Sequence, residues 1–333
     1  MSGPLLAVDA GGTSTRAVVL DADGTCRGTG RAGSGNPTSS GAATALASMA
    51  RAARDALAAA AVAPGRVTGV VIAMAGAEGP LPSPALAAAV GYTGPAARLR
   101  RVGDLPAMYS SGTADAVGAA LVCGTGSVAG RVADGELVRV VGGSGWLLGD
   151  AGSGYWTGLQ VVRAVVAHLD GSGEATSLTA AVLAAEGVAA GDATRHGRPE
   201  HLHQLLDALY AAPPLALARF SPLAFAAAAG PAPDPVAARV VAQGGDALAA
   251  LLRALRLQPG ETLVAGGSTW RHGVAGSGAP RSPALTAALA GLRVQPAEDG
   301  LLGAAVLALR LDGPVDAVVH ERVRSSLARL RGG

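Results

Sequence analysis

Asp9-Ala-Gly-Gly-Thr-Ser-Thr-Arg16 is the stretch of sequence that decides the fold. The apolar residues 5–8 precede it and predict a buried strand that delivers the aspartate into a tight turn. The two glycines let the backbone approach an anion closely, and successive N–H groups together with the Thr13 hydroxyl can cradle a phosphate. A second strand is expected over residues 15–21, and Asp23-Gly24 predicts a hairpin into a third.

The same unit recurs about a third of the way along the chain. Its parts are a strand over 119–123, the turn Gly124-Thr-Gly-Ser127, a strand over 128–133, the hairpin turn Asp134-Gly135 and a strand over 136–141. Further strands are expected over 67–73 and 99–102, and they alternate with helical segments, which is typical of an α/β layer with a largely parallel sheet. The repeated unit predicts two related domains that face each other and grip one polyphosphate between their turns.

A third glycine turn, Gly266-Gly267-Ser268, ends a late strand predicted over residues 262–265. Two glycines leave a flat surface without side chains, where an adenine could lie; an ordinary β–α turn is the alternative. Residues 155–257 are mainly helical in pattern. Other helices are expected over residues 41–63 and 300–311 and after Pro314.

Composition narrows the chemistry. The chain has 333 residues, enough for two domains, and no lysine, so all 26 basic residues are arginines. P-loop nucleotidases, protein kinases and pyridoxal enzymes each need a lysine, and all three classes are excluded. The net charge of +2 is too small to indicate a nucleic-acid or membrane partner, and no apolar run reaches membrane-spanning length. With no visible signal peptide and two widely separated cysteines, Cys26 and Cys123, we expect a soluble, reduced, cytoplasmic protein.

Two more segments could carry chemistry. Asp104 follows the strand at 99–102, where ligands bind in open α/β sheets, so it is either a catalytic base or a helix N-cap. The stretch from Gly142 to Gly154 has six glycines in thirteen residues, and we expect no regular structure there. Within it, Asp150 is either a turn residue or a ligand for sugar hydroxyls, and Trp146 is expected to anchor the core rather than to stack on a sugar.

Taken in order, these motifs resemble the actin-like ATPase superfamily, which includes hexokinases and heat-shock chaperones. Residues 9–16 look like its first phosphate motif, 121–130 like its second and 263–268 like its adenosine motif. The stretch 142–154 narrows the resemblance to the N-acetylglucosamine kinase family, which is grouped with the ATP-dependent activators of benzoyl-CoA reductase. Ser34-Gly-Asn-Pro37 and Ala73-Met-Ala-Gly76 fit that family too.

The resemblance implies an α/β fold of two actin-like, ribonuclease H-like domains with an ATP cleft between them. Residues 1–112 would form the domain with the first phosphate motif and the sugar site. Residues 113–333 would form the nucleotide-binding domain with a helical insert, and the last helix could pack back on the first domain. The implied reaction is phosphorylation of an amino sugar, N-acetylglucosamine above all, on its 6-hydroxyl by ATP and Mg²⁺ in a homodimer.

The resemblance also implies residue roles. Asp104 would take the proton of the sugar hydroxyl, and Asp9 would position Mg²⁺ through water. The residues implied to bind the sugar are Asn36, Asp104, Gly143, Ser144, Gly145 and Asp150. Those implied to bind the nucleotide are Gly11, Gly12, Thr13, Gly124, Thr125, Gly126, Gly266, Gly267 and Ser268.

The chain departs from the family at Gly103, where an asparagine is usual, and at Ala151, where a glutamate is frequent. Two alternatives stay open. One is a glucosamine kinase. The other, from a different class, is an ATPase that activates a partner reductase through a bridging iron–sulfur cluster, which needs exposed cysteine thiolates.

Overall fold

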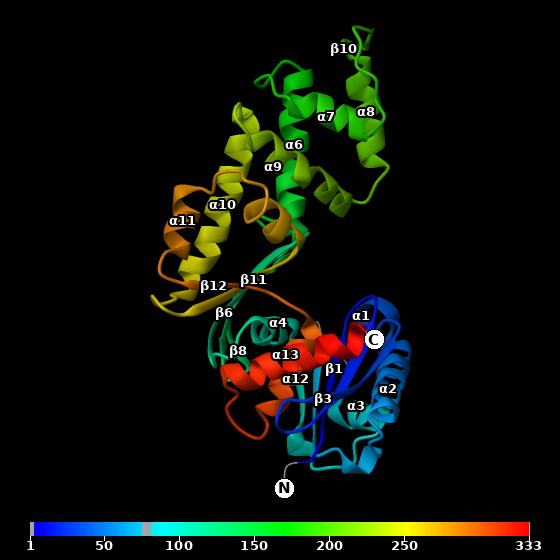
Figure 1. Ribbon diagram of the computed structural model, residues 1–333. Coiled ribbons are helices and arrows are strands. Elements are labelled where there is room, and N and C mark those ends of the chain that lie inside the picture. The colour runs from blue at the N-terminus through cyan, green and yellow to red at the C-terminus, as the bar shows by residue number, and fades with distance from the viewer. Residues whose placement is uncertain (1–2, 75–80, 333) are drawn as a thin grey trace.

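Two five-stranded β-sheets form the framework of the protein, and helices cover both faces of each (Figure 1). They come from a computed structural model, of which residues 3–74 and 81–332 are described. The motif predicted at residues 73–76 therefore lies partly outside the described residues. Among these residues, no helix is both long and apolar enough to cross a lipid bilayer.

The first sheet uses the N-terminal part of the chain. Its order is β3-β2-β1-β4-β5, with β1 (Leu5–Ala10), β2 (Thr15–Leu20), β3 (Cys26–Ala32), β4 (Gly69–Met74) and β5 (Leu99–Val102). β2 is antiparallel to β1 and β3, whereas β4 and β5 run parallel to β1. Because side chains alternate along a strand, Leu6 and Val8 pack toward α2 (Ala42–Ala59) and α3 (Ser83–Val90), and Leu5 and Ala7 pack toward α12 (Gly300–Leu309) and α13 (Ala317–Gly332).

The second sheet has the order β12-β11-β6-β7-β8. Its strands are β6 (Val117–Cys123), β7 (Ser127–Ala133), β8 (Glu136–Gly142), β11 (Thr262–Gly266) and β12 (Arg293–Pro296). One face packs against α4 (Asp104–Gly112) through Leu105 and Tyr109. The other face packs against α10 (Pro235–Leu255) and α11 (Pro283–Leu289).

The two sheets share one topology, strand for strand. β6, β7, β8, β11 and β12 pair in the same senses as β1, β2, β3, β4 and β5: two antiparallel pairs, then two parallel pairs. The predicted hairpins are present, with Gly24 and Gly135 at positive φ angles of 90° and 78°. The duplication predicted from the two Gly/Thr turns is therefore confirmed in the topology, and the two turns occupy equivalent places, each between the first two strands of its sheet.

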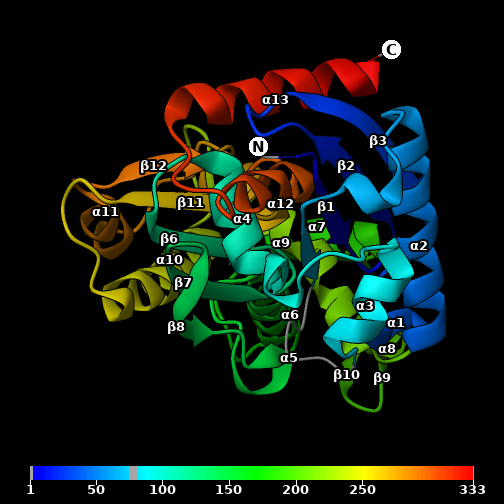
Figure 2. The same ribbon diagram turned by 90° about the horizontal axis from the view of Figure 1, so that it is seen from below.

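Two helices cross between the sheets. α4 follows β5 of the first sheet but packs against β6 and β11 of the second, and α12 follows β12 of the second but packs against β1 and β4 of the first. Figure 2 shows α4 and α12 side by side between the two sheets. They approach so closely that a Cβ on Gly303 would lie 2.6 Å from the carbonyl carbon of Ala107. The exchanged helices tie the two units together and place the first residues of each helix where the units meet.

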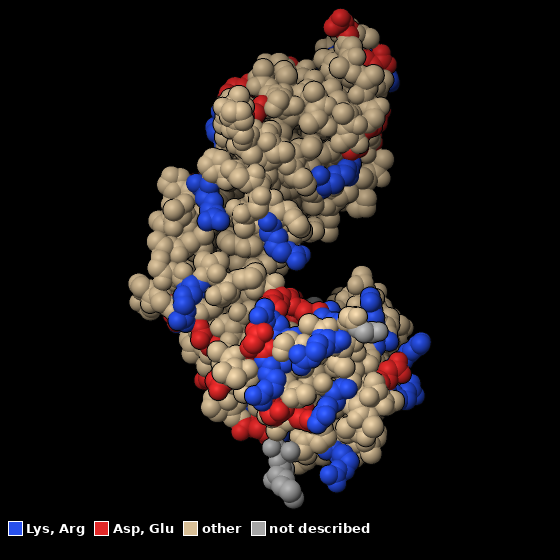
Figure 3. Space-filling model, viewed as in Figure 1, with Lys and Arg blue, Asp and Glu red and all other residues tan. Residues whose placement is uncertain are grey.

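A helical insert lies between β8 and β11. It contains α6 (Gly154–Leu169), α7 (Leu178–Ala185), α8 (Glu200–Tyr210), the 3₁₀ segment η3 (Pro214–Phe220) and α9 (Ser221–Ala228). Its short β9–β10 ribbon (Thr194–Arg195 and Arg198–Pro199) was not predicted, because two-residue strands leave no periodic pattern. Figure 1 places the insert at the end of the molecule away from the N-terminus, and Figure 3 shows the surface hollowed between it and the first sheet's unit.

Short elements complete the chain. They are α1 (Pro37–Ser40), η1 (Pro64–Arg66), η2 (Ala96–Arg98), α5 (Gly145–Leu148) and the π-helix η4 (Thr269–Val274). The expectation of no regular structure over residues 142–154 was wrong, since α5 forms inside this stretch and α6 begins at its last residue. α5 leaves Trp146 40% exposed, so the expected core anchor is a surface residue that meets the edge of Tyr155 with ring centroids 5.8 Å apart.

Candidate active site

The second phosphate turn, Gly124–Ser127, is fixed by its own backbone and by the start of α6. The Gly124 N–H donates to the Gly126 carbonyl at 2.9 Å. The carbonyls of Gly124 and Thr125 accept from the N–H groups of Gly154 and Tyr155 at 2.7 and 3.1 Å. Thr125 itself is exposed. A turn held at its carbonyls keeps a rigid shape, and its exposed threonine is free to meet a ligand.

The third glycine turn packs directly on the second phosphate turn. Gly267 has a φ angle of 99°, and a Cβ there would lie 2.7 Å from the Gly124 nitrogen and closer still to the Cys123 carbonyl. Thr269, the residue after this turn, donates its hydroxyl hydrogen to the Gly124 carbonyl at 2.9 Å. The turns predicted to hold phosphates and adenosine are thus one continuous surface, on which Ser268 is exposed.

A pocket of about 330 Å³ opens beside this surface. It lies between α9 and the π-helix η4, and its walls include Ser221, Phe225, Ser268, Thr269 and His272. Of these residues only Ser268 was predicted from the sequence. The rest come from the insert and from a π-helical turn, an irregularity that is frequent at functional sites but leaves no signature in an apolar periodicity.

Asp150 lies on the second phosphate turn. It is 9% exposed and has a left-handed φ of 57°, and its Oδ1 accepts the N–H of Ser127 at 3.1 Å. A Cβ on Gly126 would lie 2.9 Å from Asp150 Oδ2. A non-glycine residue in this strained conformation is uncommon and is worth a functional explanation. The predicted sugar ligand is therefore held within contact distance of the turn predicted to hold the phosphates.

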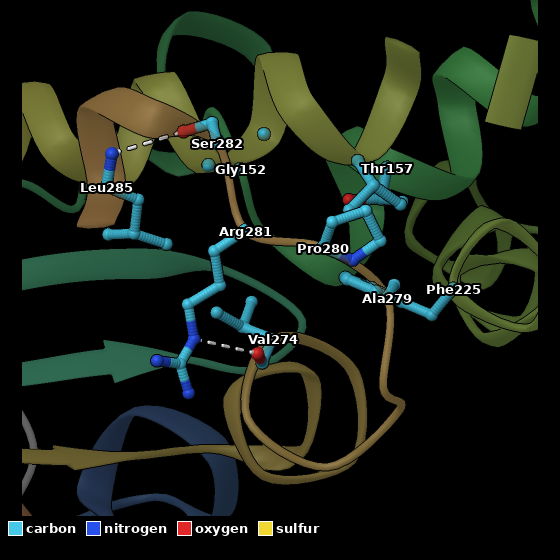
Figure 4. Close-up of a pocket in the computed structure, with 12 residues that line it drawn as sticks. Gly152, Thr157, Phe225, Val274, Ala279, Pro280, Arg281, Ser282 and Leu285 are labelled. Carbon is cyan, nitrogen blue, oxygen red and sulfur yellow. Dashed lines mark hydrogen bonds between the residues drawn. The ribbon is translucent and has the colours of Figure 1, made fainter. Parts of the chain in front are cut away.

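The back of this segment is close-packed against α10. A Cβ on Gly152 would lie 2.5 Å from the Gly244 carbonyl. Figure 4 shows the small cavity beside this contact, where the Ser282 hydroxyl accepts the Leu285 N–H at 3.1 Å and Arg281 Nε donates to the Val274 carbonyl at 3.3 Å. Its volume of about 10 Å³ leaves room for about one water, so it is a packing seam and not a substrate pocket.

The first phosphate turn carries Asn36 beside it. The Gly11 N–H donates to the Ser14 carbonyl, and the Gly35 N–H donates to the Gly11 carbonyl, both at 3.0 Å. A Cβ on Gly35 would lie 2.9 Å from that of Ala10, so only glycine fits this close approach. Asn36 caps α1, its Oδ1 accepting the Thr38 N–H at 2.8 Å, and its NH₂ group is the part that can donate to a substrate. Gly12 and Thr13 form the tip of the hairpin between β1 and β2.

Asp9 belongs to a charge network that the sequence did not reveal. Arg16, its register partner on β2, donates to the carboxylates of Asp9 and Asp299, the latter at 2.6 Å, and Arg331 donates to Asp299 at 2.5 Å. Burial raises the pKa of Asp9, and the hydrogen bond and charge of Arg16 offset this only in part. Burial also acts to raise the pKa of Asp299, but the Arg331 hydrogen bond and the Arg16 charge outweigh it and the pKa is lowered.

This network bears on the predicted metal site. Within the described residues, no group of three or more histidine, cysteine, aspartate or glutamate side chains could hold a metal ion. Asp9 offers one carboxylate, and Arg16, which also binds Asp299, is attached to it. That donor set fits an ion that keeps most of its water and takes its other ligands from phosphates, as Mg²⁺ does.

Asp104 is exposed at the first turn of α4, with Gly103 as the N-cap residue. Its Oδ1 accepts the N–H of Leu105 at 3.0 Å. Asp104 and Asp299 have similar positions in the two helices that cross between the sheets: Asp104 is the first residue of α4, and Asp299 is the N-cap of α12. The predicted sugar residues are split between the units: Asn36 and Asp104 lie with the first sheet, while Asp150 and the exposed Gly143, Ser144 and Gly145 lie with the second.

Both cysteines are buried. Burial raises the pKa of the Cys26 thiol, and it raises that of Cys123 to about 12. Cys123 lies under the second phosphate turn, with its Sγ 3.4 Å from the Gly152 carbonyl. Neither thiol has the exposed, ionised form that binding a cluster at a subunit interface requires.

Comparison with known proteins gives one family and a set of similar structures. The chain matches the BadF/BadG/BcrA/BcrD ATPase family over residues 6–308. It is 25% identical to a protein from Chromobacterium violaceum, provisionally named an N-acetylglucosamine kinase, with a TM-score of 0.59 over 92% of this chain and 99% of that one. No curated protein matches the chain significantly.

Two further solved structures support the fold. A protein from Porphyromonas gingivalis with the same provisional name is 20% identical, with a TM-score of 0.60 over 93% of this chain and 100% of that one. A ROK hexokinase from Thermus thermophilus is 19% identical, with a TM-score of 0.50 over 91% and 98%. The predicted family resemblance and the α/β fold of two actin-like units are confirmed.

Proposed function

Because the chain belongs to the BadF/BadG/BcrA/BcrD ATPase family, we propose that it is an ATP-dependent kinase of an amino sugar, with N-acetylglucosamine as the acceptor. The observation that carries the proposal is the matched pair of turns. Gly11–Ser14 and Gly124–Ser127 occupy equivalent places in two sheets of one topology. The N–H groups of Gly11, Gly124 and Ser127 are hydrogen-bonded within the protein, so the turn tips would supply the donors. The N–H groups of Gly12 and Thr13 in one turn and of Thr125 and Gly126 in the other would hold a polyphosphate between them without lysine.

The nucleotide has a natural place on the second unit. The pocket of about 330 Å³ beside Ser268 and Thr269 would take the base, and Gly267 leads from it to the exposed Thr125. Gly266, which was also expected to border the adenine, is buried, and a Cβ on it would lie 2.6 Å from that of Ala297. Asp9 would hold Mg²⁺ through water, and bound Mg²⁺ supplies charge neutralisation at the phosphates. The absence of lysine from the chain fits this mode of binding, in which amides and hydroxyls hold the phosphates.

Asp104 is the residue we assign to proton removal. Its Oδ1 is occupied by the Leu105 N–H, so Oδ2 would accept the proton of the sugar 6-hydroxyl as the oxygen attacks the terminal phosphorus of ATP. The carboxylate is exposed at the carboxyl end of a strand, where it can reach a ligand between the units. A general base needs this access, whereas a purely structural cap does not.

The sugar would bridge the two units. Asn36 and Asp104 would bind it from the first unit, and Asp150 with Gly143, Ser144 and Gly145 from the second. The hollow in Figure 3, between the helical insert and the first unit, is the space that closure around a sugar would narrow. Closure that assembles the site only when the sugar is present would keep water from consuming ATP.

The acetamido group is favoured over a free ammonium by Ala151. An ammonium would call for a carboxylate, and the family's frequent glutamate is absent at this position. Ala151 is exposed next to Asp150, and its methyl side chain carries no charge for an ammonium. The reductase activator is disfavoured because both thiols are buried.

The test is a coupled assay of ADP release with N-acetylglucosamine, glucosamine and glucose. We expect the highest kcat/KM for N-acetylglucosamine, and a loss of kcat/KM in Asn36→Ala and in Asp150→Ala. More than about tenfold preference for glucosamine, equivalent to about 1.4 kcal/mol, would overturn the acetamido argument. No turnover with any sugar, from protein that binds ATP, would reject the kinase itself.

A further inference from the structure

A second concave site lies on the first unit, separate from the glycine turns. It is a pocket of about 440 Å³ between β2, β3, the first turn of α12 and the end of α13. α13 runs across β3 and brings its last turn to this place (Figures 1 and 2). Three arginines, Arg16, Arg31 and Arg331, line the pocket. Arg16 is the last residue of the first phosphate motif, but no residue of the turns 11–14 and 124–127 lines the pocket.

Two of these arginines lie opposite each other in the sheet, where their charges repel. Arg16 and Arg31 are register partners on adjacent antiparallel strands, and like charges directly opposite each other destabilise a sheet. Arg331 adds a third positive charge from α13. An arrangement with this cost calls for anions to offset it.

The carboxylates present offset it only in part. Asp9 and Asp299 pair with Arg16, and Asp299 also pairs with Arg331. Arg31 is exposed and forms no ion pair with the part of the chain that the structure describes. Among the residues that the structure describes, three guanidinium groups thus share two carboxylates, which gives this part of the pocket a net positive charge.

Hydrogen-bond donors are also left over. The guanidinium of Arg31 is exposed and has no hydrogen-bond partner among the described residues. The Nε of Arg16 also has no partner among them, but it is buried and would donate to a ligand only after the side chain moves. Arginine forks match the oxygens of phosphate in geometry and charge, so the free guanidinium of Arg31 beside two further arginines favours a phosphate over a simple halide.

We propose that this pocket binds a phosphate-type anion, either free inorganic phosphate or the phosphoryl group of a phosphorylated metabolite. Binding there does not depend on the proposed kinase activity. Because Arg16 also holds Asp9, the occupant lies one side chain away from the predicted Mg²⁺ residue. A phosphorylated effector at this place could therefore be sensed at the nucleotide site without touching the glycine turns.

The test measures thermal stabilisation and calorimetric binding with inorganic phosphate and, in a second arm, with glucose 6-phosphate. Ligand that binds the folded state raises the thermal midpoint in proportion to its occupancy. We expect saturable binding to the parent protein and at least about a tenfold loss of affinity in Arg31→Gln. Arg66→Gln, which removes an exposed arginine far along the chain from the pocket, is the matched control and should bind like the parent.

Two further measurements distinguish loss of the anion site from misfolding and from phosphate binding at the nucleotide site. Without phosphate, Arg31→Gln should be at least as stable as the parent, because it removes the repulsion with Arg16. Phosphate should still bind when the protein is saturated with ADP. Absent binding to the parent, equal binding to Arg31→Gln, or complete competition by ADP would each overturn the proposal, the last by assigning the anion to the nucleotide site.

Discussion

Replacing Gly267 with alanine should separate the two turns that form the proposed nucleotide surface. Gly267 has a φ angle of 99°, and its new Cβ would lie 2.7 Å from the Gly124 nitrogen and closer still to the Cys123 carbonyl. Real Cβ atoms do not approach within 3.0 Å, so the second phosphate turn would have to move by roughly 0.7 Å. The substitution therefore acts on the site through its backbone and removes no functional group.

The magnitude follows from two contributions. A left-handed backbone costs a non-glycine residue about 1–2 kcal/mol. Forcing an extra methyl into a close-packed contact costs about 1–3 kcal/mol more. Gly260→Ala is the matched control: it lies before the same strand β11, has a φ of 85°, and nothing lies within 4 Å of its new Cβ. Gly260→Ala should lose only the free energy of the left-handed backbone. The difference in free energy of unfolding between the two variants therefore gives the cost of the close contact at Gly267.

Mg-ATP affinity, measured by calorimetry or by fluorescence of a nucleotide analogue, is the assay. Displacement of binding groups by an ångström can cost about 100-fold, so we expect Gly267→Ala to weaken ATP binding by about 10- to 100-fold. Gly260→Ala should stay within about twofold of the parent. If Gly267→Ala is folded by circular dichroism and binds Mg-ATP as tightly as Gly260→Ala, the contact between the two turns has no part in nucleotide binding.

Three further predictions follow from other parts of the structure. Asp104→Asn should lower kcat by about 10²–10⁴ while ATP binding stays normal, and a variant within a few-fold of the parent would make Asp104 only part of a helix terminus. Asp234 caps α10 and also accepts from Thr176 and Ser177, so Asp234→Ala should lower the free energy of unfolding by about 1–2 kcal/mol at pH 7. Burial acts to raise the pKa of Asp234, but these hydrogen bonds lower it overall. Asp234 therefore stabilises the fold fully above the usual aspartate pKa of 3.8, and this stabilisation is lost as pH falls through the lower folded-state pKa. The difference in free energy of unfolding between the parent and Asp234→Ala should accordingly be smaller in acid than at pH 7. The purified protein should be colourless, and its kinase activity should survive Cys26→Ala and Cys123→Ala, whereas an iron–sulfur absorption lost in either variant would revive the reductase activator.

The sequence by itself determined the repeated unit and therefore the fold. Asp9–Arg16 and Cys123–Ser127 each join an apolar strand to a turn of glycines and hydroxyl residues. All the residues that shape such a turn lie within a few positions of one another, so the sequence alone predicts it. The place of Asp104 after a strand was equally local. The excess of glycine over residues 142–154 led to a wrong expectation, because composition could not show that the middle of this stretch forms the helical turn α5.

Only the tertiary structure decided which of these segments touch. Asp150 meets the Ser127 N–H, Gly267 meets Cys123, and the pocket joins Phe225 to Thr269, although each pair is separated by tens of residues. The network of Arg16, Asp299 and Arg331 spans almost the whole chain. No local window contains both partners of such contacts. The first three contacts form because β11 pairs with β6 and α9 packs on η4 within the second unit and its insert. The Arg16 network forms because α12 crosses to the first sheet and brings Asp299 to β2.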